Sequence, residues 1–138
     1  MSFIYFHAME KILRILLIED DNDDIELIQD ALQDNGVTHQ MHVIKDGGLV
    51  APYLEAPKEI PNIIVMDFNL PKVHGRDILK QIKQTDDFKN IPLVILTTSS
   101  SQDDISYSYK EGANRYLIKP TTIVGIKAVV DVIKELAV

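Results

Sequence analysis

Short apolar runs alternate with stretches of helical periodicity along the whole chain, and this alternation limits the folds open to it. The runs that we expect to be strands are 13–18, 41–44, 63–66, 93–96 and 116–118. Apolar residues at helical spacing follow them, over 21–36, 47–54, 75–85, 103–111 and 123–137. Strands that are apolar throughout and separated by helices indicate a parallel sheet covered on both faces. We therefore expect an α/β fold in which a β-α unit occurs five times.

Length and composition restrict the classes of protein further. The chain has 138 residues, 46% of them hydrophobic, which is enough for the core of one domain. We expect that domain over 11–138, preceded by an N-terminal extension over 1–10 for which disorder is one option. The absence of cysteine excludes disulfides and thiolate metal sites, and it fits a cytoplasmic protein. The net charge of −7 argues against nucleic acid as a partner, and no apolar run is long enough for a membrane span.

Polar residues stand where four of the five apolar runs end. They are Glu19, Asp20, Asp67, Thr97, Thr98 and Lys119. Because the carboxyl ends of parallel strands meet at one edge of a sheet, we expect these side chains to lie close together. Three neighbouring carboxylates repel one another unless a cation lies between them, and oxygen ligands suit Mg²⁺. In such a site Asp67 is placed to attack a phosphoryl group and form an aspartyl phosphate.

Each of these residues has a plainer explanation when taken alone. The acidic run 19–21 is a common helix cap, and a lone Asp67 after a strand is a common turn residue. The hydroxyl run 97–101 reads equally well as a polar loop before a helix, and Lys119 before Pro120 as a surface lysine. All of these explanations would have to hold together at one edge of one sheet, so we favour a functional site.

Several segments of the chain resemble the receiver domains of two-component response regulators. The resemblance rests on Glu19-Asp20-Asp21, IVMDFNLP at 64–71, Gly75, LTT at 96–98 and YLIKP at 116–120, and it covers about 12–136. It implies a flavodoxin-like, doubly wound, five-stranded parallel sheet in the order 2-1-3-4-5. DFNLPK at 67–72 and IPLVILTTSS at 91–100 are similar to the stand-alone regulators of phytochrome-type and other hybrid kinases.

The resemblance also implies roles for single residues. Asp67 is the expected phosphoacceptor, Lys119 pairs with the phosphoryl group, and Thr97 and Tyr116 are the switch residues. The backbone N–H of Thr98 is expected to reach the phosphoryl group, and Asn69 and Ser99 stand where the family tunes the rate of dephosphorylation.

The same resemblance implies a Mg²⁺ site. Its expected ligands are Asp20, Asp67 and the backbone carbonyl of Asn69, with Glu19 acting through water. Asp21 extends the acidic run, which leaves the choice of ligand open by one residue. His74 stands where the family usually has Asp, at a loop position that is not catalytic.

We therefore expect a single-domain response regulator that is a signalling phosphoacceptor rather than an enzyme. Its donor would be a sensor histidine kinase or a phosphotransfer protein, and its output an unidentified downstream protein. A homodimer through the last two helices and the fifth strand is a further expectation.

Three alternative functions make different demands on the sequence. A phosphohydrolase of the haloacid dehalogenase type needs a second acid where Asn69 stands. A receiver-like binding module that works without phosphorylation would be indicated by loss of Asp67, Asp20 or Lys119, and all three are present. A flavodoxin-like cofactor binder needs a phosphate-cradling loop after the first strand, where the chain is acidic instead.

Overall fold

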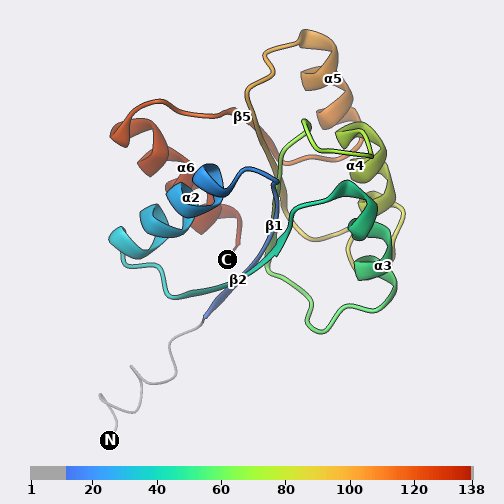
Figure 1. The fold of residues 1–138 in the computed structure, drawn as a ribbon, viewed down its shortest axis with the longest axis horizontal. Coiled ribbons are helices and arrows are strands. Elements are labelled where there is room, and N and C mark those ends of the chain that lie inside the picture. Colours follow the sequence, from blue (N-terminus) through green and yellow to red (C-terminus); the bar gives the residue numbers. More distant parts are fainter. Residues whose placement is uncertain (1–11, 138) are drawn as a thin grey trace, which may run out of the picture.

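The computed structural model describes residues 12–137, and these form a parallel sheet with helices on both faces (Figure 1). The strands are β1 (Leu13–Ile18), β2 (His39–Ile44), β3 (Ile63–Met66), β4 (Leu93–Thr97) and β5 (Arg115–Ile118). The helices are α2 (Asn22–Asp34), η1 (Gly47–Leu49), α3 (Val50–Glu55), α4 (Gly75–Lys83), α5 (Gln102–Lys110) and α6 (Ile123–Leu136). The expectation for 1–10 lies outside the described residues.

The strand order is β2-β1-β3-β4-β5, and every neighbouring pair is parallel. This confirms the expected fold class and topology. The direction of sequence travel reverses between β1 and β3, so the ends of these two strands form the switch point of the sheet. Ile18 is level with Met66 in the register, and the residues that follow them, Glu19 and Asp67, therefore emerge beside each other.

Alternate strand residues fill two separate cores, one on each face of the sheet. Helices α2 and α6 cover one face, and α3, α4 and α5 lie on the other (Figure 1). In β1, for example, Ile15 and Leu17 face α2 and α6, whereas Leu16 and Ile18 belong to the other core. A strand that is buried on both faces has to be apolar at every position, which is why these runs were visible in the sequence.

The two edge strands are less buried than the three central ones. We expected strands that are apolar throughout, but β2 is longer than expected, beginning at His39, and it alternates between half-buried and exposed residues. An edge strand has a neighbour on one side only, so its polar side chains reach water. At the other edge, the hydroxyl of Tyr109 accepts a hydrogen bond from the backbone N–H of Tyr116 at 3.0 Å.

Side-chain caps set where the helices begin. Asp21 caps α2, Ser101 caps α5 and Thr122 caps α6, each by accepting from backbone N–H groups of the first turn. His74 caps α4, since its Nδ1 accepts from the backbone N–H of Arg76 at 3.0 Å. His74 thus supplies the acceptor that an aspartate would supply at this position.

Gly75 is required by a close approach rather than by an unusual backbone angle. A Cβ atom on Gly75 would lie 2.4 Å from the Cα atom of Phe68. The start of α4 is therefore packed directly against the loop that follows Asp67. Among the described residues, no helix is both long enough and apolar enough to cross a bilayer.

Candidate functional site

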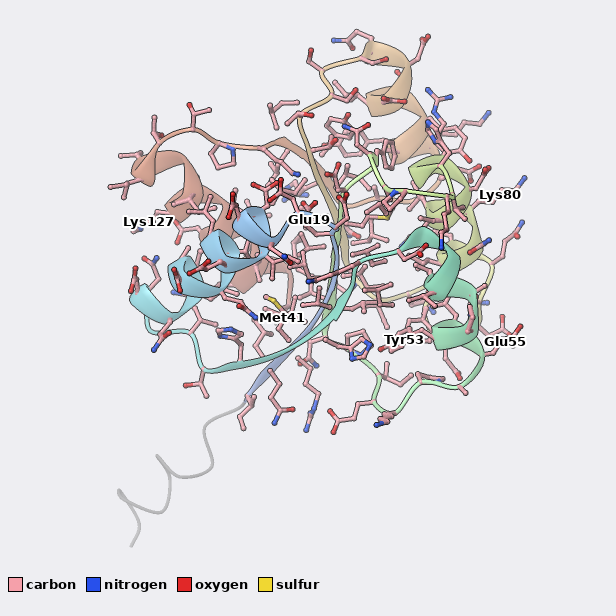
Figure 2. All side chains as sticks on the ribbon, in the orientation of Figure 1. Glu19, Met41, Tyr53, Glu55, Lys80 and Lys127 are labelled. Carbon is pink, nitrogen blue, oxygen red and sulfur yellow. The ribbon has the colours of Figure 1, made fainter. Side chains whose placement is uncertain are left out.

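Three carboxylates gather at the carboxyl ends of β1 and β3. Oxygen atoms of Glu19, Asp20 and Asp67 all lie within 4.8 Å of one another. The backbone fixes this arrangement, because the N–H of Asp67 donates to the carbonyl of Ile18 at 3.0 Å. Glu19 and Asp67 are 2% and 4% exposed, whereas Asp20 reaches solvent. Glu19 lies inside the molecule at the end of β1, while Lys80 and Lys127 point outward from their helices (Figure 2).

The ammonium group of Lys119 lies among these carboxylates. Its Nζ is 2.8 Å from Glu19 Oε1 and 2.8 Å from Asp67 Oδ2. A third acceptor is Asp24 Oδ2, on the first turn of α2, at 2.7 Å. Lys119 reaches this position because its backbone N–H continues the pairing of β5 with β4, donating to the carbonyl of Thr97 at 2.8 Å.

Burial and hydrogen bonding act in opposite directions on the two buried groups. Burial by itself would lower the pKa of Lys119, but hydrogen bonds to Asp24, Asp67 and Glu19 outweigh it and raise that pKa above its ordinary value. For Glu19, burial raises the pKa to about 7, with the nearby charge of Asp67 adding to the effect and Lys119 opposing it. The surrounding carboxylates therefore stabilise the charged form of Lys119.

This donor set fits a hard divalent cation. The oxygen atoms of Glu19, Asp20 and Asp67 are close enough together to share one ion, and the described cluster of potential ligands contains no nitrogen or sulfur. Glu19, Asp24 and Asp67 contact the ammonium of Lys119, and Asp20 lies beside two of these acids, so acidic groups outnumber the lysine in the described site. Oxygen-only sites of this kind suit Mg²⁺.

Hydroxyl and amide groups form another wall of the site. Thr97 is fully buried at the end of β4, and the side-chain amide of Asn69 lies 3.5 Å from its Oγ1. The same amide donates to Thr98 Oγ1 at 3.3 Å. The backbone N–H of Asn69 donates to Asp67 Oδ1 at 3.0 Å, which fixes the second oxygen of that carboxylate. The predicted site residues from four strand ends are thus brought together.

Ser99 is turned away from this group. Its hydroxyl donates to Asp104 Oδ2 at 2.8 Å, and its backbone carbonyl accepts from the hydroxyl of Tyr116 at 2.8 Å. The half-buried ring of Tyr116 packs edge-on against Phe68, with centroids 6.1 Å apart. Tyr116 therefore connects β5 with the loop after β4 and with the residue that follows Asp67.

Asp24 was not predicted as a member of this site, because its position indicated only negative charge at the start of a helix. A signal was present in the helical spacing. Asp24, Ile28 and Leu32 recur at intervals of four, so they share one face of α2, and both apolar members of the set are buried. An acid on the core-facing side of a helix, one turn from the strand end, is a candidate partner for a buried cation.

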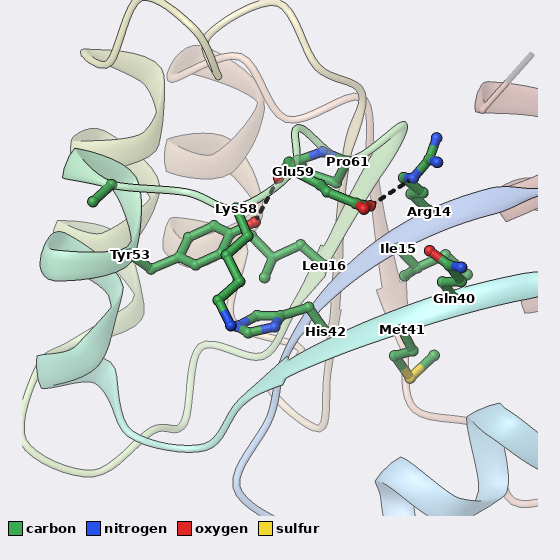
Figure 3. A pocket seen from close by; sticks show the side chains of 11 residues that line it. Arg14, Ile15, Leu16, Gln40, Met41, His42, Tyr53, Lys58, Glu59 and Pro61 are labelled. Atoms are coloured by element: carbon green, nitrogen blue, oxygen red, sulfur yellow. Dashed lines mark hydrogen bonds and ion pairs between the residues drawn. The ribbon is translucent and has the colours of Figure 1, made fainter.

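A separate hollow in the described structure lies away from this cluster. This cavity of about 400 Å³ is beside the first halves of β1 and β2, whereas Asp67 follows the last residue of β3 (Figure 3). The rings of His42 and Tyr53 stack there at 4.9 Å, and Arg14 pairs with Glu59 at 2.7 Å. Its Arg14–Glu59 pair is largely solvent-exposed, and the carboxylate cluster lies apart from it, so we do not assign it to the site.

Comparison with known proteins agrees with the geometry. The family model described as the response regulator receiver domain matches residues 15–131. The chain belongs to this family. The receiver domain is 41% identical to response regulator Rcp1 of Synechocystis sp. over 110 residues, which cover 76% of this chain and 75% of Rcp1. It is 38% identical to the probable methanogenesis regulatory protein FilR2 of Methanothrix harundinacea, covering 88% of this chain and 81% of that protein.

Solved structures give the same assignment. The phosphorylated cyanobacterial phytochrome response regulator RcpA superimposes on the receiver domain with a TM-score of 0.81 at 37% identity, covering 91% of this chain and 93% of that one. The Mn²⁺-bound form of Rcp1 has a TM-score of 0.79 at 36% identity, covering 89% and 92% of the two chains. The predicted resemblance to phytochrome-type regulators is confirmed.

Proposed function

We propose that this receiver domain takes a phosphoryl group onto Asp67 from a phosphohistidine of a sensor kinase or phosphotransfer protein, with Mg²⁺ bound beside it. The observation that carries the proposal is the position of Asp67. Its carboxylate is 4% exposed, touches the Lys119 ammonium at 2.8 Å, and lies within 4.8 Å of the oxygen atoms of two further acids. Relatives of this chain include a phosphorylated regulator and a metal-bound one.

The reaction is a transfer between two nucleophiles. One carboxylate oxygen of Asp67 attacks phosphorus and forms a P–O bond, while the P–N bond of the phosphohistidine breaks. The imidazole nitrogen leaves with the electron pair of that bond. The product is a mixed anhydride. Because the attacking carboxylate is already ionised, no side chain of the receiver has to remove a proton from it.

Lys119 and Thr97 have separate tasks in this proposal. The Lys119 ammonium already lies at 2.8 Å from Asp67 Oδ2 and is placed to meet the negative oxygen atoms of the incoming group. The hydroxyl of Thr97, with the Asn69 amide as its neighbour at 3.5 Å, can turn to donate to one of those oxygen atoms. Held by Asp20, Asp67 and the backbone carbonyl of Asn69, with Glu19 acting through water, Mg²⁺ would supply the charge neutralisation that phosphoryl transfer requires.

Signalling would follow from the movement of Thr97 and of the loop behind it. Tyr116 is connected to that loop through the carbonyl of Ser99, so a shift there reaches the surface of α5 and β5. Tyr109 and Ile118 on this surface are 48% and 47% exposed. We propose it as the surface that contacts a downstream protein or a second copy of the receiver.

The phosphohydrolase alternative is weakened by the position of Asn69. Its side chain donates to Thr98 Oγ1 at 3.3 Å, and an amide cannot act as the second acid that hydrolysis of this type needs. The alternative of a phosphorylation-independent binding module keeps the fold but makes no use of the acid cluster. An uptake experiment separates all three.

Purified protein is incubated with acetyl phosphate and Mg²⁺ and followed by intact mass. We expect the mass of one phosphoryl group to be gained by the wild type, not by Asp67→Asn, and not in the presence of EDTA. Asp46→Asn is the matched control, because Asp46 is an acid paired with Lys72 outside the cluster. Uptake that survives in Asp67→Asn would refute the assignment of the acceptor. Catalytic release of phosphate without a stable adduct would favour the hydrolase.

The oligomeric state is tested on the same protein. Light scattering after size exclusion, with and without beryllofluoride, is expected to report a larger mass when the phosphoryl mimic is bound. An unchanged monomer would argue that a different protein contacts the surface of α5 and β5.

A further inference from the structure

The Lys119 ammonium contacts three carboxylates of two kinds. It donates to Asp67 and forms an ion pair with Glu19, and both of these acids belong to the cluster that shares space for a metal ion. It also donates to Asp24, which is not a member of that cluster, and this is the shortest of the three contacts at 2.7 Å. Asp24 is therefore the partner of Lys119 that the metal cluster does not include.

Asp24 approaches the ammonium from a helix, whereas the other two acceptors come from strand ends. It belongs to the first turn of α2, and Asp21 holds that turn in place by accepting from the backbone N–H of Asp24 at 3.3 Å. The side chains of Asp24 and Lys119 are 31% and 15% exposed, so water screens the pair only in part. Both residues also border a small hollow between α2 and α6, with Leu27 and Leu96.

We propose that Asp24 is a positioning residue for phosphoryl uptake: its carboxylate holds the Lys119 ammonium beside Asp67 while a divalent ion occupies the strand-end carboxylates. The inference rests on the proposed function of the site. It gives a role to a residue that neither the metal cluster nor the phosphoacceptor explains.

The physical reason is a competition for the same oxygen atoms. A divalent ion near Glu19 and Asp67 would weaken the attraction of these two carboxylates for Lys119. It would also repel the ammonium directly. Without another partner, a largely buried ammonium would be left with weakened contacts, which is costly. Asp24 remains as a counter-charge in the metal-bound state, so its attraction to Lys119 matters more there than in the metal-free state.

The expected consequence is that loss of Asp24 weakens metal binding. Asp24→Asn should raise the dissociation constant for Mg²⁺ about fivefold, the effect of one close, partly screened charge pair. Asp23→Asn is the matched control, because Asp23 stands in the same helical turn, carries the same charge and is exposed. It should change the constant by about twofold or less, since it acts only through screened, long-range attraction.

A double-mutant cycle isolates the part that passes through Lys119. Mg²⁺ affinity is measured by calorimetry for Asp24→Asn and Asp23→Asn, each in the wild type and in Lys119→Met. We expect the excess effect of Asp24→Asn over Asp23→Asn to disappear when Lys119 is replaced, because non-additivity reports direct coupling between neighbours. Asp24→Glu, which keeps the charge, should restore part of the affinity.

A readout on Lys119 itself distinguishes positioning from general support of the fold. The signal of its ammonium group, followed by NMR in EDTA, should change its chemical shift and exchange faster with water in Asp24→Asn, and it should stay as in the wild type in Asp23→Asn. Equal effects of the two variants on Mg²⁺, or an additive cycle, would overturn the role of Asp24. Wild-type uptake from acetyl phosphate is measured alongside: its absence would count against the proposed function, whereas uptake with an additive cycle would count against Asp24 alone.

Discussion

Arg76 on α4 and Asp104 on α5 form an ion pair in which Nε and Nη2 of the arginine donate to one carboxylate oxygen, at 3.0 and 2.8 Å. The other oxygen accepts from the hydroxyl of Ser99. Burial would raise the pKa of Asp104, but the hydrogen bonds from Arg76 and Ser99 outweigh it and hold that pKa below its ordinary value. The pair therefore joins two helices and the loop after β4.

Removal of Arg76 is expected to destabilise the fold. Arg76→Ala should lower the free energy of unfolding by about 1–2 kcal/mol, because it leaves a partly buried carboxylate with a weaker set of partners. Since Arg76 lowers the pKa of Asp104, this difference is present above the ordinary carboxyl pKa and is lost as the pH falls through the lowered one. Urea denaturation measures it. Lys89→Ala, which breaks the exposed pair with Asp86, should cost no more than about 0.5 kcal/mol.

The raised pKa of Glu19 leads us to expect an unusual pH dependence of stability in the metal-free protein. Its pKa is raised from 4.5 to about 7, so between these values the folded state holds a proton that the unfolded state releases. Stability from this group is therefore greatest at the acid end of the window and decreases as the pH rises toward 7. The test is urea denaturation in EDTA across this range, comparing the wild type with Glu19→Gln. A difference between the two proteins that does not change with pH would contradict the prediction.

Gly75 leaves no room for a side chain beside the loop that follows Asp67. Gly75→Ala would place a methyl group 2.4 Å from the Cα of Phe68, and relief of that clash has to move the residue next to Asp67. We expect a loss of about 1–3 kcal/mol in stability, as for other overpacked positions, together with weaker Mg²⁺ binding. Calorimetric titration with Mg²⁺ provides the second measurement.

Gly36 supplies the comparison for that variant. It has a positive φ of 72° and nothing within 4 Å of its missing Cβ. Gly36→Ala should cost about 1 kcal/mol through backbone conformation alone and leave Mg²⁺ affinity unchanged. Equal effects of the two variants on metal binding would show that the contact with Phe68 is unimportant for the site.

The hydroxyl of Tyr116 should stabilise the loop after β4. Tyr116→Phe keeps the ring against Phe68 but removes the hydrogen bond to the carbonyl of Ser99 at 2.8 Å. We expect faster amide hydrogen exchange over the first turn of α5 and a loss of about 0.5–1.5 kcal/mol in stability. Tyr53→Phe removes a comparable bond from α3 to the carbonyl of Glu59 in the loop before β3, and exchange in α5 should not respond to it.

The parallel sheet and the grouping of acids could be predicted because both depend on local patterns, whereas the strand order was implied by the resemblance to receiver domains. Buried central strands such as 63–66 are apolar at every position, and Asp67 comes directly after one of them. Once the strands are parallel, their ends must meet, so the neighbourhood of Glu19, Asp67 and Lys119 follows from topology.

The contacts that were not predicted depend on the rotamers that long side chains adopt in the folded protein. Lys119 and Asp24 are 95 positions apart, and their pairing is decided by the rotamer of the lysine and the entry angle of α2. The same is true of Arg76 and Asp104, which stand on helices with unremarkable patterns. The partial polarity of β2 was missed because the expected strand covered only 41–44, whereas β2 begins two residues earlier with the polar His39 and Gln40.

The hydroxyl of Tyr109 accepts from the backbone N–H of Tyr116, on the outer side of the edge strand β5. Without this bond, that N–H could pair with a strand of another molecule. A strand from another chain cannot extend the sheet past β5 at that point without displacing it. This contact therefore disfavours main-chain pairing at Tyr116 and leaves side chains to hold a partner there. If the proposed function holds, side-chain contacts of this kind suit a complex that forms and separates as the phosphoryl group is gained and lost.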